Sequence, residues 1–578
     1  MDARPTMTPG IGRQEEEVSV PDLVERLHVE GHGELDVADE VRRVGGTPGE
    51  FAQAMRSLGY SPSDMAKAVK HLDQSCPHEA AGDIGTLPVY PDSRPVLDGG
   101  SHCDIRTTAN DSWDAIEQAN IPEQFFTHGG VAVWVKAGPH AVAVVEPITV
   151  ARMTHLLGEV GGWEKLDKQS GQIDPCRPPK PVAEHMVADP HPRLPWLRRL
   201  VRVPVFDSAG RLVMQPGYHG ESGLFLAPRD LRLWRVPHAP TPAEIASAKS
   251  FIYEHIEDFP FVDEADRTNA VIFGMLPYVR DLISGPTPLH LITKPYPGSG
   301  ATLLVQALYY SAIGTRAAMQ SVPTTEVEWE YRMTATLLAS PDVVVFDNVH
   351  DELKSGQFMT ALTETVWEAR KVKTSELPSL PINNAWAATG NNVRVSDEMS
   401  RRTIPVRLDP HTDRPFDRTG FHHPDLIAWT DEHRSDLVHA NLTLAQAWVA
   451  EGMPRGTLVV GMYEAWAAVM SGIAEVVDLP DLRANWSEWD ESRPSNANLI
   501  RKVVAAWQAE LGDRQVKARE LLPVIGPLLD IDPTGERASE TALGIRLRGC
   551  QGSVIDGHEI VGHDVSGSRS WKLVRRSS

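Results

Sequence analysis

The chain has 578 residues, enough for several domains at roughly 100–200 residues each. Apolar residues make up 41% of the sequence and charged residues 23%, a composition that excludes wholesale disorder. Lysine and arginine number 56 against 78 aspartates and glutamates, giving a net charge of −22, so a uniformly basic nucleic-acid-binding protein is excluded and any DNA contact must use a local basic surface.

The four cysteines, at positions 76, 103, 176 and 550, include no Cys-x-x-Cys pair, which predicts a reduced, cytoplasmic protein. No apolar run approaches the ~20 residues that a membrane-spanning helix needs, so we expect no membrane partner. The first residues lack the apolar stretch of a signal peptide. Cys76, His78, His102 and Cys103 do not have the spacing of a common zinc finger, and buried thiols with surface histidines are the favoured interpretation.

The first part of the chain divides into two regions by pattern. Residues 1–103 predict a flexible tail, a small helical unit and a linker rich in proline and glycine. Residues 104–238 predict a mixed α+β domain, because short β-type runs at 131–135 and 141–145 are separated by a turn. The proline-rich stretch 174–195 is expected to be an internal loop.

Residues 239–424 alternate between helical and strand patterns, which predicts a core with a parallel sheet. Residues 425–490 predict a helical lid or connector, and residues 491–578 a separable C-terminal unit. The expected fold class is therefore multidomain α/β, with an α+β N-terminal region. The expected core strands are 289–293, 342–346, 385–389 and 403–409.

The loop after the first core strand has the layout of a P-loop, in which backbone N–H groups and a helix N-terminus hold nucleotide phosphates. In the motif GxxxxGK[ST], Gly300 and Thr302 fit, whereas Pro295 replaces the first glycine and Ala301 replaces the lysine. Thr302 is the predicted Mg²⁺ ligand of the loop. The candidate nucleotide-binding residues are Lys294, Pro297, Gly298, Ser299, Gly300, Ala301, Thr302 and Leu303.

The missing lysine matters because it normally contacts the β- and γ-phosphates, and its loss weakens hydrolysis. Lys294 lies at the end of the strand before the loop and could reach the phosphates from the other side. The alternative is a strand-to-helix turn that binds nothing.

Polar residues follow the later strands of the predicted core. Asp347 ends a buried strand, where a carboxylate suits a Mg²⁺ shell, and Asn391 and Asn392 end the next strand, where an amide could position an attacking water. Arg401 and Arg402 close a short helix, a place that suits an arginine finger acting across a subunit boundary. The alternatives are a turn-forming Asp-Asn pair and a helix-end arginine pair that offsets the helix dipole.

Basic residues gather between these two strands. Arg370, Lys371 and Lys373 are close in sequence, and the two lysines alternate around Val372, so they would share one face of a strand. Cations are what contacts to DNA phosphates need. The alternative is a solvated charged loop.

The C-terminal unit shows two helical patterns followed by two strands, the order of a winged helix. Arg546 and Arg548 would lie on or just past the helix that enters the DNA groove, and Lys572 near the wing. A winged helix used for protein contacts is the alternative. His422 and His423 are expected to be ordinary loop residues.

The segments LHLITKPYPGSGATLL, VVVFDNV, AWAATGNN and MSRRTIPVRLD resemble primase-helicase-type AAA+ ATPases of phages, plasmids and integrated mobile elements, which lie near the superfamily 3 helicases. The resemblance covers about residues 105–450. It implies a P-loop core that uses ATP and Mg²⁺, unwinds single-stranded or forked DNA and assembles as a ring, usually a hexamer. It also implies that a basic hairpin between the two strands enters the ring pore.

Carried over by motif, the resemblance makes Asp347 the Walker B acid, Asn391 or Asn392 the sensor, and Arg401 or Arg402 the finger. The sequence departs from the pattern at Ala301 and at Asn348, where many AAA+ proteins have a catalytic glutamate. Glu328 or Glu330 could supply the base instead.

Two main functions are therefore compared. The first is an ATP-dependent DNA helicase or replication-initiation ATPase of a mobile genetic element. The second, favoured by Ala301, is a nucleotide-gated DNA-binding scaffold that does not hydrolyse ATP; a regulator or a defence ATPase on the same fold is a third. Residues 104–235 show no acidic metal triad, so no primase chemistry is assigned.

Overall fold

The computed structural model describes most of the chain from residue 94 onward. The described residues are 54–55, 58, 94–100, 104–138, 142–167, 170–350, 353–369, 379–393, 395–412, 414–492, 496–532, 537–551, 554–565 and 568–576. Most of the small helical unit expected within 1–103 lies outside them, as do the cysteines and histidines at 76, 78, 102 and 103 and the basic positions Arg370, Lys371 and Lys373. None of the described helices is both long and apolar enough to cross a membrane.

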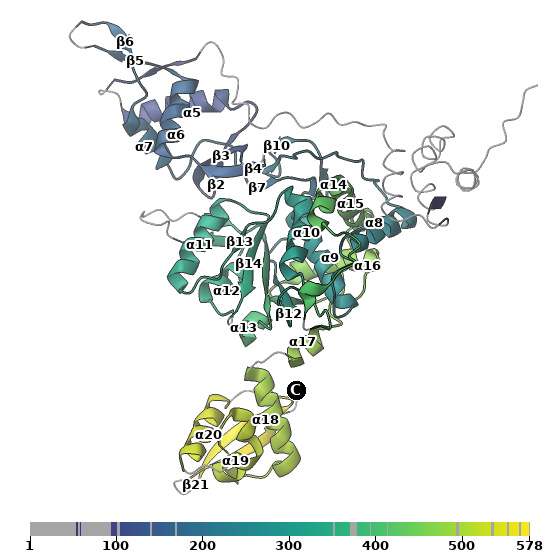
Figure 1. Ribbon diagram of the computed structural model, residues 1–578. Coiled ribbons are helices and arrows are strands. Elements are labelled where there is room, and N and C mark those ends of the chain that lie inside the picture. Colours follow the sequence, from purple (N-terminus) through teal and green to yellow (C-terminus); the bar gives the residue numbers. More distant parts are fainter. Residues whose placement is uncertain are drawn as a thin grey trace, which may run out of the picture.

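The N-terminal region is a mixed unit of three helices and short strands (Figure 1). Its elements are β1 (Val96–Asp98), α5 (Ile105–Ala119), β2 (Phe125–His128), β3 (Val131–Ala137), β4 (Ala143–Pro147), α6 (Val150–Val160), β5 (Gly162–Leu166), β6 (Ile173–Pro175) and α7 (Lys180–Val187). The expectation of a loop over 174–195 was wrong, because α7 lies there. Proline in the first helical turn is tolerated, since its missing N–H would have no partner in the helix, and Val182 and Met186 bury the apolar face of α7.

Five short strands follow, of which β10, β11 and β7 form one small sheet and β8 and β9 another. They are β7 (Arg199–Val201), β8 (Val205–Phe206), β9 (Leu212–Val213), β10 (Gly217–His219) and β11 (Leu224–Leu226). Most of their buried side chains belong to the same apolar cluster as those of α8 (Pro242–His255) and α9 (Glu264–Val279), whereas Leu200 and Phe225 pack in a second cluster with β2, β3 and β4. The apolar core thus continues across residue 238.

The central sheet has five strands in the order β13-β14-β17-β12-β18, and every neighbouring pair is parallel. The strands are β12 (Leu289–Lys294), β13 (Met319–Gln320), β14 (Val343–Val349), β17 (Ala385–Asn391) and β18 (Thr403–Arg407). The parallel α/β core predicted from the alternation is confirmed. Asp347 lies inside β14, and Asn391 is the last residue of β17.

Helices cover both faces of this sheet (Figure 1). Side chains alternate along each strand, so Val343 and Val345 of β14 join the cluster of α9 and α10, whereas Val344 and Phe346 join that of α11 and α12. The helices are α10 (Ala301–Ile313), α11 (Glu326–Leu338), α12 (Gly356–Thr363), α13 (Asp397–Ser400), α14 (Leu426–Glu432), α15 (Arg434–Ala450) and α16 (Glu464–Val476). Helices α15 and α16 pack into the same cluster as α9 and α10.

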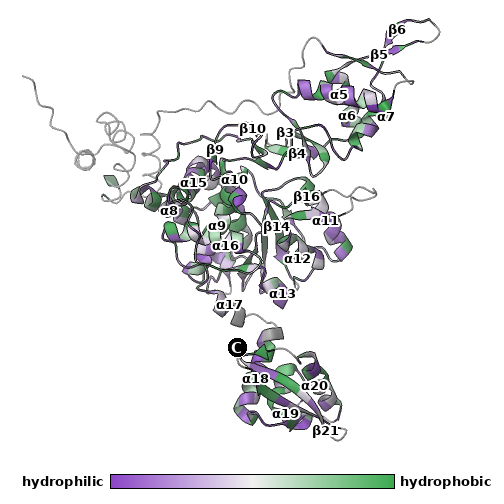
Figure 2. Cartoon of the chain, turned by 180° about the vertical axis from the view of Figure 1, so that it is seen from behind, coloured by the Kyte–Doolittle hydropathy of each residue, from purple (hydrophilic) through white to green (hydrophobic). Residues whose placement is uncertain are grey.

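Two further strands, β15 (Val366–Glu368) and β16 (Ser379–Pro381), pair antiparallel on the chain between β14 and β17. The C-terminal unit has its own core around Trp507 and Trp571. In Figure 2 its helices and strands carry both hydrophobic (green) and hydrophilic (purple) stretches. Its strand order is β19-β22-β21-β20. Its elements are α18 (Asn496–Leu511), β19 (Val516–Lys517), α19 (Ala518–Ile525), α20 (Arg537–Gly549), β20 (Val554–Ile555), β21 (His558–Val565) and β22 (Ser568–Arg575).

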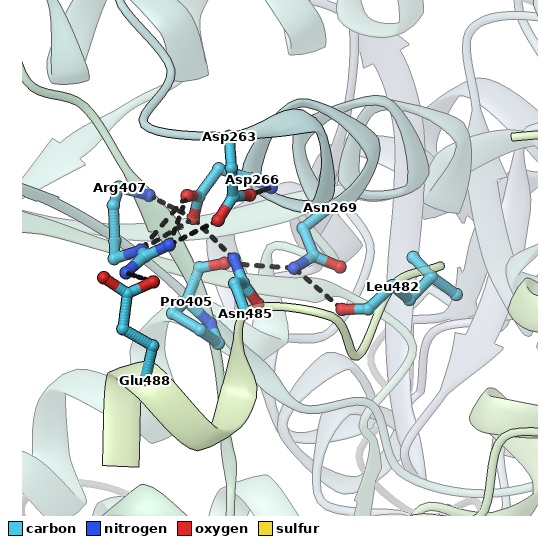
Figure 3. Close-up of polar contacts among 8 residues, drawn as sticks. All are labelled: Asp263, Asp266, Asn269, Pro405, Arg407, Leu482, Asn485 and Glu488. Atoms are coloured by element: carbon cyan, nitrogen blue, oxygen red, sulfur yellow. Dashed lines mark hydrogen bonds and ion pairs between the residues drawn. The ribbon is translucent and has the colours of Figure 1, made fainter. Parts of the chain in front are cut away.

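A buried ion pair ties the last core strand to the segment that leads to the C-terminal unit (Figure 3). The carboxylate of Asp266, in α9, accepts hydrogen bonds from the backbone N–H of Arg407 at 2.8 Å, from its Nε at 3.1 Å and from Nδ2 of Asn485 at 2.7 Å. Arg407 also contacts Asp263 at 2.6 Å and Glu488 of α17 (Trp486–Ser492) at 3.0 Å. One guanidinium therefore joins α9, β18 and α17.

Burial raises the pKa of Asp266 to about 7 from 3.8, against the opposing effect of Arg407. The folded chain then binds more protons than the unfolded chain between these two values, so this group makes folding less favourable as the pH rises from about 4 to about 7. We expect wild type to lose on the order of 2 kcal/mol relative to Asp266→Asn between pH 5 and pH 8. Urea unfolding of both proteins at the two pH values measures this difference, and a gain in the stability of wild type relative to Asp266→Asn from pH 5 to pH 8 would contradict it.

Candidate functional site

The loop between β12 and α10 has a backbone that only glycine adopts easily. Gly298 and Gly300 have φ angles of +89° and +93°, in the left-handed region that side chains disfavour. Gly300 is the residue before α10 and has no side chain to cap it. The first N–H groups of α10 are therefore left for an acceptor from outside the helix, the arrangement that binds anions.

Two threonines hold Asp347 at the same edge of the sheet. Oδ1 of Asp347 accepts hydrogen bonds from Thr302 Oγ1 at 2.7 Å and from Thr389 Oγ1 at 2.6 Å. The backbone N–H of Asn348 donates to Thr389 Oγ1 at 3.1 Å. The sequence pattern indicated Thr302 and Asp347 but missed Thr389, whose only signal was its place beside the two asparagines in ATGNN.

A local irregularity in β14 accompanies this contact. The register between β14 and β17 shifts between Phe346 and Val349, and Asn348 has a φ of +57°. Asparagine tolerates this conformation better than most residues. The Asp-Asn pair of the sequence is thus not a turn after the strand but a bulge within it.

The two asparagines at the end of β17 have different surroundings. Asn392 donates its backbone N–H to the carbonyl of Lys294 at 3.0 Å and its Nδ2 to the carbonyl of Pro295 at 3.4 Å, so it holds the start of the loop. Asn391 lies opposite Lys294 in the strand register. Its side-chain oxygen is buried and accepts no hydrogen bond from the described residues.

Lys294 stands at the carboxyl end of β12, half-buried. Burial lowers the pKa of its ammonium, and the carboxylate of Asp347 acts in the opposite direction. The end of β12 thus carries a cation although the motif lysine is absent.

The position that the motif lysine would occupy is buried. Ala301 is 0% exposed and belongs to the large apolar cluster. Over the other side of the loop lies a 3-10 turn, η3 (Pro415–Asp417), whose Phe416 comes within 3.4 Å of where a Cβ on Gly298 would be. Phe416 itself is 68% exposed. The sequence pattern did not indicate this neighbour.

Arg401 and Arg402 lie at the opposite edge of the sheet. The carbonyl of Arg402 accepts a hydrogen bond from the N–H of Leu289, at the start of β12. Lys294 lies five positions further along β12, or about 17 Å at ~3.3 Å per residue. The two arginines are therefore not brought together with Asp347 within one chain. Arg402 donates to the carbonyl of Glu398 at 2.5 Å, whereas Arg401 is exposed.

The remaining predicted residues lie elsewhere. Arg546 and Arg548 are exposed near the end of α20, and Lys572 is half-buried in β22. Glu328, considered as a base, is engaged within α11 by an ion pair of 2.5 Å to Arg332.

Comparison with known proteins gives distant similarities only. No protein-family model and no curated protein matches the chain. The solved apo structure of the C-terminal region of NrS-1 is similar at 10% identity and a TM-score of 0.34, over 75% of this chain and 94% of that one. JCV helicase is similar at 13% identity and a TM-score of 0.19, over 42% of this chain and 72% of that one. Similarities of this degree establish neither a common fold nor a common activity.

Proposed function

We propose that the chain is an ATP-dependent DNA helicase, or a replication-initiation ATPase, of a mobile genetic element. The observation that carries the proposal is the hydrogen-bonded group of Thr302, Asp347 and Thr389 beside the uncapped N-terminus of α10. A helix N-terminus next to a hydroxyl and a carboxylate is the arrangement that binds a nucleotide phosphate together with its Mg²⁺.

The residues present fit a magnesium–nucleotide complex. Mg²⁺ is a hard cation that binds one or two protein oxygen ligands together with substrate phosphates and water. The hydroxyl of Thr302 and the carboxylate of Asp347, 2.7 Å apart, would hold it. Thr389 is a positioning residue, because its hydrogen bond fixes the carboxylate from the side of β17. When bound, the ion neutralises charge on the phosphates.

Lys294 takes the part of the missing P-loop lysine. A lysine at Ala301 would have to leave the apolar cluster in which that side chain is buried. Lys294 instead lies at the end of the strand before the loop. The charge of Asp347 raises the pKa of the Lys294 ammonium, against the effect of burial. A cation there would compensate the β- and γ-phosphates.

Asn391 is assigned as the residue that orients the attacking water, since its side-chain oxygen has no hydrogen bond from the described residues and Asn392 is engaged by the loop. Arg401 is assigned as the finger that completes a neighbouring subunit's site. Its place at the far edge of the sheet and its exposure suit an interface between copies. A ring, in the simplest case a hexamer, would provide six such interfaces.

DNA would contact two basic surfaces. The first is the connection between β15 and β16, which carries Arg370, Lys371 and Lys373 and would enter the ring pore. The second is a winged helix formed by the C-terminal unit, with Arg546 and Arg548 on α20 and Lys572 on β22. Both supply phosphate contacts without base readout.

A nucleotide-gated scaffold that binds DNA without hydrolysis is the second candidate. It rests on Ala301, because the motif lysine is the group whose loss most directly weakens hydrolysis.

We expect Lys294→Met to weaken Mg-ATP binding by roughly 10-fold or more, because it removes a charge-assisted contact to phosphate. Asp347→Asn is expected to abolish the dependence of binding on Mg²⁺. Titration calorimetry measures both, and Lys165→Met, at an exposed position of β5, is the control that should bind like wild type.

The same proteins are then assayed for phosphate release with and without single-stranded DNA. Release that DNA stimulates and Asp347→Asn abolishes supports the ATPase. Tight Mg-ATP binding without release supports the scaffold. Failure of wild type to bind any Mg-nucleotide contradicts both.

We expect Arg401→Ala and Asp347→Asn to be inactive separately but to regain activity when mixed. In an equal mixture about a quarter of the interfaces combine an intact Asp347 with an intact Arg401 of the neighbour. Phosphate release from the mixture measures the recovery. Mixing Arg401→Ala with a chain carrying both substitutions is the control, and no recovery in the test mixture would show that Arg401 does not act across subunits.

We expect the double substitution Arg546→Ala/Arg548→Ala to weaken DNA binding equally for different sequences. Each lost phosphate contact should also reduce the slope of log affinity against log salt by about 0.9. Fluorescence anisotropy over a salt series measures both quantities. Arg193→Ala, which removes an exposed arginine paired with Asp114 in the N-terminal region, should leave the slope unchanged; equal slopes in all proteins would contradict a role for α20.

A further inference from the structure

The loop histidines His422 and His423 meet a carboxylate from a distant part of the chain. Ligand atoms of Glu254, near the end of α8, and of both histidines lie within 4.8 Å of one another. Nε2 of His423 is 3.5 Å from Oε1 of Glu254, and the two side chains are only 10% and 5% exposed. The expectation that these histidines are ordinary loop residues does not account for the burial of His423.

The surroundings hold the histidines in place. Oδ2 of Asp258 accepts the backbone N–H of His422 at 2.8 Å and that of His423 at 3.4 Å. The ring of His423 stacks on Trp429 with centroids 4.1 Å apart. A backbone turn bound by a carboxylate and a ring stacked on an indole fix the direction of the imidazole without any other ligand.

In His422, one ring nitrogen has a partner among the described residues and the other does not, as is common in histidines that bind metals. Nδ1 of His422 lies 3.1 Å from Oε2 of Glu257, which leaves Nε2 of His422 for another partner. Histidines that bind metals commonly donate their second nitrogen to a carboxylate in this manner. Nε2 of His423 is buried and has no hydrogen bond within the described part of the chain.

We propose that Glu254, His422 and His423 form a binding site for one transition-metal ion of the Zn²⁺ type. Two imidazole nitrogens and one carboxylate oxygen are a ligand set that Zn²⁺ accepts, with water in the fourth position. Mg²⁺ and Ca²⁺ are disfavoured because they prefer oxygen ligands. The alternative use of the same contacts is an ion pair between a protonated His423 and Glu254.

An ion at this position would connect two parts of the chain. The segment that carries the histidines also carries Phe416, which lies against the phosphate loop at Gly298, and Arg418, which donates to the carbonyl of Asp258 at 2.9 Å. An ion bound by Glu254 and the two histidines would fasten this segment to the end of α8. The inference rests on side chains outside the nucleotide site and does not depend on the proposed function.

Titration of the metal-free, full-length protein with Zn²⁺ tests the site, with calorimetry giving affinity and stoichiometry. The chain has 22 histidines and four cysteines, so the readout is the difference between variants. We expect His422→Gln and His423→Gln each to lose one equivalent or to bind it at least ~10-fold more weakly. His411→Gln is the matched control, because His411 lies on the same segment 3.5 Å from Asp409 but is exposed.

A second measurement separates metal binding from folding. Zn²⁺ should raise the thermal unfolding midpoint of wild type and of His411→Gln but not of His422→Gln, whose substituted side chain is half exposed and leaves the buried contacts intact. Equal Zn²⁺ binding by wild type and both histidine variants, or no Zn²⁺ binding by wild type, would overturn the proposal and leave the ion pair as the role of these residues.

Discussion

Parallel pairing of β12, β17 and β14 is the constraint on which the site depends. Because the three strands run the same way, their carboxyl ends meet at one edge of the sheet, where ligands of open α/β sheets bind. The insertion of β17 between the other two places Thr389 against Asp347. After β17 the chain returns to the opposite edge of the sheet, where α13 ends just before Arg401 and β18 begins.

The departure from the P-loop motif is consistent with the packing around it. Ala301 is enclosed by the apolar cluster of α9 and α10. The first residue of α10 therefore packs in the core, and its side chain does not face a phosphate as the motif lysine would. A cation is supplied by the strand instead, because Lys294 is the last residue of β12. Phosphate charge can be compensated from either side of the loop, since the Coulomb interaction has no directional requirement.

Contacts distant in sequence connect this edge to the rest of the molecule. The segment before α14 reaches the loop through Phe416 and reaches α8 through its histidines. On the other side of the same core, Arg407 joins α9 to α17, which leads to the C-terminal unit. Both connections start next to the carboxyl edge of the sheet. A movement of the loop would therefore reach α8 and α17 through a few direct side-chain contacts.

The sequence by itself determined the parallel core and the glycine-containing loop after its first strand, and it indicated Thr302 and Asp347 as candidate residues, because strand alternation and the preference of glycine for turns are local properties. It did not determine the helix α7, whose prolines suggested a loop, or the bulge at Asn348. Only the tertiary structure brought Thr389 to Asp347, distinguished Asn391 from Asn392, placed Arg401 on the far edge and joined His423 to Glu254. The physical reason is that these contacts join residues far apart along the chain or on separate strands, and their geometry is fixed by strand order and helix packing, which no local pattern encodes.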